Sequence, residues 1–198
     1  MGRAFLALYE VTGQREWLNR AVAAAAFIEA NFASPLGYVS SAGTKMLTAQ
    51  PALDENIPLA RFTNALFHYT GNQSHRKTAE AAMRFSVAAE KGARGSTWEV
   101  LTADDELARE PLHITIVGSK SDEAARALFA AALALPETYR RIEWWDRSEG
   151  ALPRNDVTYP PLPRSAAFVC TANRCSLPVF RASDLGAKIA VLTAASPT

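Results

Sequence analysis

The two cysteines are the side chains of this sequence with the most direct chemistry. Cys170 and Cys175 are the only cysteines of the sequence, with four residues between them. A thioredoxin-type redox pair has two intervening residues and opens a helix, which lowers the thiol pKa, and neither feature is evident here. A zinc site needs about four ligands, and His68, His75 and His113 have no metal-ligand spacing to the cysteines. We favour two partly buried thiols, with a reversible disulfide as one alternative and a metal half-site as the other.

Carboxylates are the second class of candidate. Glycosidases use two carboxyl groups, about 5 to 9 Å apart, across the bond that they cleave, and Asp54, Glu55 and Asp146 are the catalytic candidates here. Successive side chains diverge, so Asp54 and Glu55 fit such a pair poorly. We favour a structural role, in which these two acids precede a helix over residues 57–69 and stabilise its positive end, with Pro58 in its first turn.

Two adjacent tryptophans offer aromatic surface. Trp144 or Trp145 could stack on a sugar ring, next to Asp146. Neighbouring side chains of a strand point to opposite faces, so the more exposed tryptophan is the candidate for ligand stacking. Residues 118–121, Gly-Ser-Lys-Ser, lie between a predicted strand and a predicted helix, where backbone N–H groups can hold an anion. They match neither the Walker loop nor the dinucleotide motif, and we interpret them as a strand-to-helix turn.

The composition excludes several classes of protein. The 198 residues are 48% hydrophobic and 21% charged, which is typical of globular chains, with 21 Lys plus Arg against 20 Asp plus Glu. This balance provides no electrostatic surface for nucleic acid or for an acidic membrane. No apolar run reaches the roughly 18 residues of a membrane span, and no secretion signal opens the sequence. We expect a cytoplasmic protein that binds no nucleic acid, membrane, metal or cofactor.

An internal repeat organises the first half of the chain. Residues 7–28 align without a gap on residues 65–86, and Thr12-Gly13 matches Thr70-Gly71. Each copy predicts a helix, a Thr-Gly turn and a second helix, because apolar side chains recur at helical spacing and glycine suits the left-handed residue that often ends a helix. Repeated helix pairs indicate an αα-solenoid or a toroid. We predict a first domain, residues 1–97, made of two αα-hairpins of an incomplete toroid.

The second half has a different pattern. Residues 113–118, 141–145 and 166–170 are predicted strands bounded by turn-forming residues. A helix separates the first two, and Ser119 with Asp122 resembles a capping box that opens it. Residues 98–110 form a short helix or a loop, and residues 182–198 add a short helix. We predict a second domain, residues 98–198, with a three-stranded, largely parallel sheet and one packed helix. The fold class is mainly α with a small α/β unit.

Five segments together resemble a known family. They are Asp54-Glu-Asn-Ile-Pro-Leu-Ala-Arg61, Tyr69-Thr-Gly71, Pro111-Leu-His-Ile-Thr-Ile-Val-Gly118, Arg141-Ile-Glu-Trp-Trp-Asp146 and Ala167-Phe-Val-Cys-Thr-Ala-Asn-Arg-Cys-Ser-Leu-Pro178. This order resembles the C-terminal part of the thioredoxin-domain proteins of the spermatogenesis-associated, or YyaL-like, family. The resemblance implies an (α/α)6 toroid of the six-hairpin glycosidase type. Relatives often have Pro-Ser-Gly-Asn where this chain has Asp54-Glu-Asn56, so a toroid-pocket residue is not transferred to that position.

The resemblance leads to three hypotheses about function. Two hairpins are fewer than the roughly three that a repeat array needs, so we expect a C-terminal module without a complete active site of its own. It would complete a toroid and one wall of a pocket, with the remainder of a longer parent chain or another copy of itself as partner. The first alternative is a carbohydrate-active enzyme, a glycosidase or sugar epimerase, in the full-length protein. The second is thiol redox, which requires the α-carbons of Cys170 and Cys175 to lie within about 7 Å.

Overall fold

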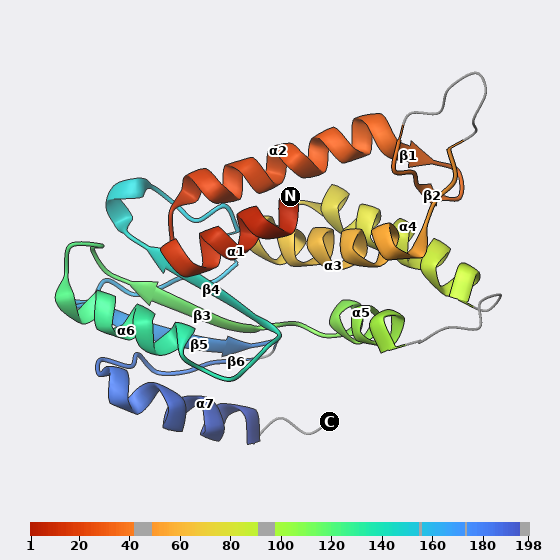
Figure 1. The fold of residues 1–198 in the computed structure, drawn as a ribbon. Helices are drawn as coiled ribbons and strands as arrows, with labels where there is room; N and C mark the ends of the chain where they lie inside the picture. Colours follow the sequence, from red (N-terminus) through yellow and green to blue (C-terminus); the bar gives the residue numbers. More distant parts are fainter. Residues whose placement is uncertain (42–48, 91–97, 155, 173, 195–198) are drawn as a thin grey trace. The chain divides into compact units, whose positions relative to one another are not determined.

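The computed structural model describes residues 1–41, 49–90, 98–154, 156–172 and 174–194 (Figure 1). It divides into two units, Met1–Arg109 and Glu110–Thr198, and each is described by itself. The division follows Arg109 rather than residue 97, because the helix over residues 98–108 packs with the preceding helices. The chain is mainly helical with a small sheet region, as the sequence predicts.

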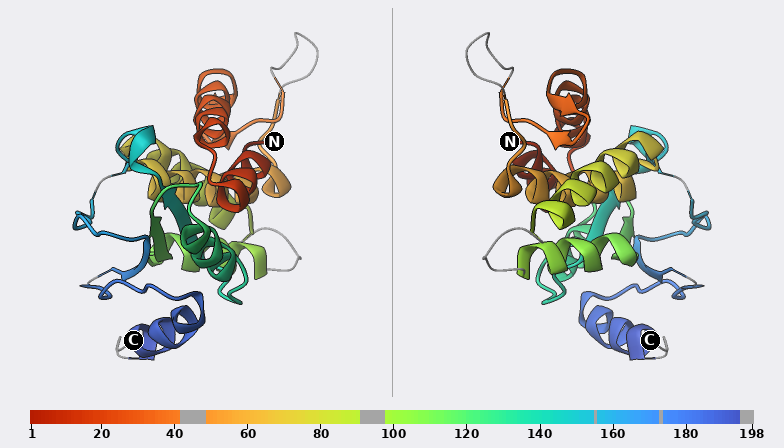
Figure 2. Two further views of the ribbon diagram at one scale, coloured as in Figure 1. Left: turned by 90° about the vertical axis from the view of Figure 1, so that its left-hand side faces the viewer. Right: turned by 90° about the vertical axis from the view of Figure 1, so that its right-hand side faces the viewer.

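The first unit contains the two predicted helical hairpins. Its elements are α1 (Gly2–Thr12), α2 (Arg15–Phe32), β1 (Ala33–Ser34), β2 (Gly37–Tyr38), α3 (Leu53–Thr70), α4 (Gln73–Glu90) and α5 (Trp98–Ala108). Helices α1 and α2 form one hairpin and α3 and α4 the other (Figure 2). The segment 98–110, predicted as a helix or a loop, is largely the helix α5.

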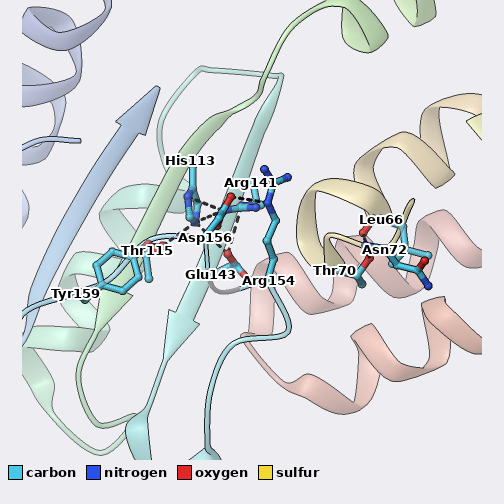
Figure 3. Close-up of polar contacts among 10 residues, drawn as sticks. All are labelled: Leu66, Thr70, Asn72, His113, Thr115, Arg141, Glu143, Arg154, Asp156 and Tyr159. Carbon is cyan, nitrogen blue, oxygen red and sulfur yellow. Dashed lines mark hydrogen bonds and ion pairs between the residues drawn. The ribbon is translucent and has the colours of Figure 1, made fainter. Parts of the chain in front are cut away.

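The turns of the two hairpins share the same glycine conformation and the same threonine hydrogen bonds. Gly13 and Gly71 end α1 and α3 in the left-handed conformation, with φ of 64° and 69°, where a side chain would clash with the backbone. The preceding threonines, Thr12 and Thr70, each donate from Oγ1 to the carbonyl four residues earlier and accept a backbone N–H two residues later. Figure 3 includes the second of these turns. The alignment of the two copies is therefore confirmed in three dimensions.

Helix α3 begins earlier than its sequence pattern suggests. The helix starts at Leu53 instead of residue 57, so Asp54 and Glu55 lie inside its first turn and Pro58 lies in its second. The predicted start was wrong because Pro58 was taken as a first-turn residue. Asn56 supplies the missing signal: it is fully buried and holds the β2 backbone, accepting from the Tyr38 N–H at 2.9 Å and donating to the Tyr38 carbonyl at 2.8 Å.

The second unit is built on a four-stranded mixed sheet. Its elements are β3 (Leu112–Val117), α6 (Glu123–Leu133), β4 (Arg140–Trp145), the 3-10 turn η1 (Arg147–Glu149), β5 (Ala166–Thr171), β6 (Arg174–Cys175), η2 (Ala182–Asp184) and α7 (Leu185–Ala194). The strand order is β4-β3-β5-β6. Strands β3 and β4 are parallel, whereas β5 is antiparallel to β3 and β6 is antiparallel to β5.

The prediction of a three-stranded, largely parallel sheet was therefore wrong. The helix α6 returns the chain for a parallel β3–β4 pair, as βαβ connections do. Between β4 and β5 the described residues of the segment 146–165 form no α-helix, and this segment brings β5 in from the opposite direction. The capping box was wrong as well, since Asp122 is the N-cap of α6 and its side chain accepts the Ala124 N–H. The predicted C-terminal helix is present as α7.

The two faces of the sheet carry different side chains. One face packs against α6 and α7 in an apolar core that contains Ile114, Ile116, Ile142, Leu128 and Leu185. The opposite face carries a smaller apolar cluster under the segment 146–165, made of Val117, Leu152, Tyr159, Ala166 and Phe168. Beside this cluster, the same face carries polar side chains of β3 and β4. The helix α6 therefore packs on the face that carries Ile114, Ile116 and Ile142, and the segment 146–165 lies on the other face.

We expect Asn56→Ala to destabilise the helical unit by about 2 to 3 kcal/mol, because the substitution leaves the Tyr38 N–H and carbonyl buried without their partner. Urea unfolding followed by circular dichroism measures the loss. Asp54→Ala, two residues away on the exposed side of the same helix turn, is the matched control and should change the free energy of unfolding by less than about 0.5 kcal/mol. Equal effects of the two substitutions would contradict this role of Asn56.

Candidate functional site

The strand register aligns four chemically active side chains in one row. Arg141 lies opposite His113, His113 opposite Cys170, and Cys170 opposite Cys175, so the row crosses all four strands from β4 to β6. Residues directly opposite one another in a sheet point to the same face. All four line one pocket of about 540 Å³, together with Arg154, Asp156 and other residues of the same unit.

The two cysteines are joined by a disulfide. Their α-carbons are 4.0 Å apart, which meets the distance required for the redox hypothesis, and the two separate thiols favoured from the sequence are not what the structure contains. The two sulfur-bearing residues differ in exposure: Cys170 is 4% exposed, whereas Cys175 lies exposed on the edge strand. An incoming reagent therefore reaches Cys175 first.

A second polar row lies next to the first, on the same face. Glu143 of β4 is opposite Thr115 of β3, and both are fully buried. The His113 ring connects the rows: its Nε2 is 3.0 Å from a Glu143 carboxylate oxygen and 2.7 Å from the Thr115 hydroxyl (Figure 3). The Thr115 hydroxyl is in turn 2.7 Å from the Tyr159 hydroxyl. These contacts link the buried Glu143 carboxylate to the Tyr159 hydroxyl of the segment 146–165.

Arg141 lies against the His113 ring. Its guanidinium Nη2 is 2.6 Å from Nδ1 and 2.9 Å from Nε2. Because a guanidinium is positively charged and can only donate, this contact favours the neutral ring over the imidazolium. Burial lowers the pKa of His113, the nearby carboxylate of Glu143 opposes this, and the charge of Arg141 lowers the pKa further.

Charged groups of the segment 146–165 complete the cluster. Asp156 lies 3.7 Å from Arg141 and 2.5 Å from the Arg154 Nε. Burial opposes ionisation of Asp156, but the two guanidinium groups dominate and hold the pKa of its carboxyl below the usual value. Burial raises the pKa of Tyr159 to about 12, with the Glu143 charge adding to the effect. Tyr159 is therefore a neutral hydrogen-bonding group at physiological pH.

This arrangement restricts the chemistry of the pocket. Thr115 and Glu143 both contact Nε2 of His113, whereas a nucleophile–His–acid triad needs the two groups on different ring nitrogens. Thr115 is also fully buried, out of reach of a substrate. Within the described ranges, no group of three or more His, Cys, Asp or Glu side chains could hold a metal ion. The reactive group that an incoming molecule can meet is the disulfide, through Cys175.

None of the three candidate carboxylates is among the residues that line this pocket. Asp54 and Glu55 are exposed in the first turn of α3, where acids favour the positive helix end. Asp146 caps η1: it accepts the backbone N–H groups of Lys120 and Ser148, and these bonds, that of Lys120 foremost, lower the pKa of Asp146 to about 2. Asp54 and Glu55 belong to the first unit and Asp146 belongs to the second.

The two tryptophans point to opposite faces of the sheet, as expected for neighbours in a strand. Trp144 is 6% exposed and packs on Phe129 of α6, with 4.6 Å between ring centroids. Trp145 is half-buried on the other face, 5.7 Å from the ring of Tyr159, with the Arg147 guanidinium 5.1 Å from its own ring. Trp145 is thus the more exposed of the two, although protein side chains already contact its ring.

The sequence reasoning missed most of the polar cluster. Arg141, Glu143, Asp156 and Tyr159 were not candidates, and His113 was considered only as a metal ligand. A signal was present: His-Ile-Thr-Ile in β3 and Arg-Ile-Glu-Trp in β4 both alternate polar with apolar residues, which is the pattern of a strand with two different faces. We interpreted the β3 segment as a buried strand, which the structure bears out, but did not use the alternation to separate its two faces.

Comparisons with known proteins add no identification. No family model matches the chain, and no curated protein matches it. In the part of the chain that the structure describes, no helix combines the length and the apolarity needed to cross a membrane.

We expect the free energy of unfolding to decrease as the pH falls below about 6.5. Folded His113 has a lowered pKa, so the unfolded chain takes up a proton that the folded chain does not bind, with a slope of at most about 1.4 kcal/mol per pH unit for one histidine. His113→Gln should reduce this slope in urea titrations between pH 5 and 7.5. His75→Gln is the companion variant, because burial also lowers the pKa of His75. An unchanged slope in His113→Gln would show that His113 does not titrate in this way.

Proposed function

We propose that the unit Glu110–Thr198 performs thiol–disulfide exchange at Cys170 and Cys175. The observation that supports this most directly is the row across the sheet: an exposed cysteine on the edge strand is bonded to a buried cysteine, and the buried one lies opposite His113 of β3. Because Cys175 is the exposed cysteine, an incoming thiolate attacks its sulfur, and Cys170 is the leaving group.

The exchange consumes two thiol groups of the partner for each protein disulfide that is reduced. A thiolate of the partner attacks Sγ of Cys175, the Cys170–Cys175 bond breaks, and its electron pair leaves on Sγ of Cys170. A second thiolate of the partner then attacks the partner sulfur of the mixed disulfide and releases Cys175 as a thiolate. Two thiols of the partner are oxidised to one disulfide, and the two thiolates of the protein take protons from solvent. Reversing the steps reoxidises the protein.

We expect a dithiol such as dithiothreitol to reduce the native chain to two free thiols without unfolding it. Free thiols are counted by alkylation and mass spectrometry in native buffer, and the fold is followed by circular dichroism in the same samples. The double variant Cys170→Ser, Cys175→Ser is the control and should keep the same spectrum. A disulfide that resists reduction until the protein is unfolded in urea would refute the proposed exchange.

A second proposal concerns the helical unit and follows the family resemblance. Leu8 and Val11 of α1 are 36% and 53% exposed, whereas the equivalent residues of the second hairpin, Leu66 and Tyr69, are 0% and 4% exposed. Tyr69 packs edge-on against Tyr9 of the first hairpin, with 5.2 Å between ring centroids. The apolar face that contains Leu66 and Tyr69 is buried in the second hairpin, whereas the equivalent face of the first hairpin, with Leu8 and Val11, is exposed.

This repetition supports a module that completes a helical toroid. By continuity with the interface between the two hairpins, the Leu8–Val11 face fits a further αα-hairpin of the same kind, supplied by the remainder of a longer parent chain. A second copy of this chain is the alternative occupant. Repeat units of this type bury their apolar faces on neighbours.

We expect the isolated chain to bind a hydrophobic dye through this face. Val11→Lys should lower the dye fluorescence and any self-association seen by light scattering after size exclusion, since it places a charge in the centre of the face. Arg3→Ala, on the same helix and exposed, is the control. Dye binding that is equal in the chain and in Val11→Lys would contradict the docking role of this face.

A further inference from the structure

We infer that Ser176 is a positioning residue for the exchange, which keeps Cys175 opposite Cys170 after the disulfide has opened. This inference rests on the proposed exchange at the two cysteines and adds a residue that regulates how readily the opened pair closes again. It is drawn from the hydrogen bonds and the register of the segment that follows β6.

Ser176 links the two residues that lie next to the cysteines. It directly follows Cys175, and Val169 directly precedes Cys170. The Ser176 backbone N–H donates to the Val169 carbonyl at 2.7 Å, and the Ser176 hydroxyl accepts the Val169 N–H at 3.1 Å. Neither bond involves a sulfur atom, so both can persist when the disulfide is open.

A β-bulge follows Ser176. If the register of β5 and β6 continued unchanged, Ala167 would lie opposite Pro178. Ala167 instead exchanges two backbone hydrogen bonds with Val179, each of 2.8 Å. The segment after β6 therefore contains one residue more than the length of β5 that it faces, which is a bulge. Pro178 has no N–H to donate, so it fits a bulge better than a regular pair.

The bulge explains why a side chain takes part in the pairing. In a regular antiparallel ladder, the Val169 N–H would donate to the backbone carbonyl of Ser176. It donates to the Ser176 hydroxyl instead, and that hydroxyl donates its own proton to the Leu177 carbonyl at 2.8 Å. The side chain of Ser176 thus replaces a ladder bond that the bulge removes, and an alanine at this position would lose it.

The consequence for the exchange is a high effective concentration of one thiol beside the other. In an antiparallel ladder, the pair next to a hydrogen-bonded pair has no backbone bonds of its own and brings its side chains closer together. Cys170 and Cys175 form such a pair, with their α-carbons 4.0 Å apart. Once the disulfide is reduced, the bonds between Val169 and Ser176 keep the two thiols close. Because groups that are held together react as an intramolecular pair, Ser176 favours the disulfide over the dithiol.

The test measures the equilibrium between disulfide and dithiol in glutathione buffers. The full chain is incubated at several ratios of reduced to oxidised glutathione and quenched with an alkylating reagent, and mass spectrometry counts the free thiols. We expect Ser176→Ala to shift this equilibrium about three- to fivefold toward the dithiol, the factor that corresponds to one hydrogen bond of typical net strength. Ser176→Thr, which keeps the hydroxyl, should retain the equilibrium of the original chain.

Ser183→Ala is the matched control, because the Ser183 hydroxyl donates to Asp184 in η2, and it should leave the equilibrium unchanged. Circular dichroism of the same samples verifies that each variant is folded. An unchanged equilibrium in Ser176→Ala, even with a lower stability of the oxidised chain in urea, would overturn the positioning role, whereas reduction of the native pair by dithiothreitol would still support the proposed exchange. Resistance of the native disulfide to both reagents would contradict the exchange and, with it, this inference.

Discussion

The register of the central strand β3 is the constraint on which the second unit depends. This strand pairs in parallel with β4 on one side and antiparallel with β5 on the other. Because side chains alternate between faces, a shift of one residue would exchange them. His113 and Thr115 would then face the apolar core under α6 and α7, and Ile114 and Ile116 would face the pocket. One register thus aligns the disulfide with its polar neighbours and fills the core.

The buried charges of Arg141 and Glu143 also help to fix the position of the segment 146–165 on the sheet. Removing Arg141 and Glu143 from water is costly, and attraction between such groups recovers the cost only with good geometry and further hydrogen bonds. Here the ion pair at 3.3 Å is supported by His113 and by Asp156. Asp156 and Tyr159 belong to the segment 146–165, whose described residues form no α-helix. Their polar contacts add to the apolar cluster around Leu152 in holding that segment over the sheet.

The sequence was sufficient for the parts of the fold that depend on local pattern. The Thr-Gly turns at Gly13 and Gly71, the buried face of the helix that contains Leu128 and Phe129, and the positions of β3, β4 and β5 follow from spacing and turn chemistry. The direction of β5 does not, because it depends on the path of the segment 146–165, which has no periodic pattern. The site needed one further step: Arg141 and Cys170 become neighbours of His113 only when the register on both sides of β3 is known.

The short span of the disulfide has a thermodynamic consequence. Cys170 and Cys175 are five residues apart in the sequence, and a cross-link that closes so small a loop removes little conformational entropy from the unfolded chain, about 2 kcal/mol against about 5 kcal/mol for a loop of about 100 residues. The strands that it joins are already paired with the rest of the sheet. Opening and closing this bond therefore costs the fold little, and its oxidation state can follow the redox poise of the surroundings largely independently of folding.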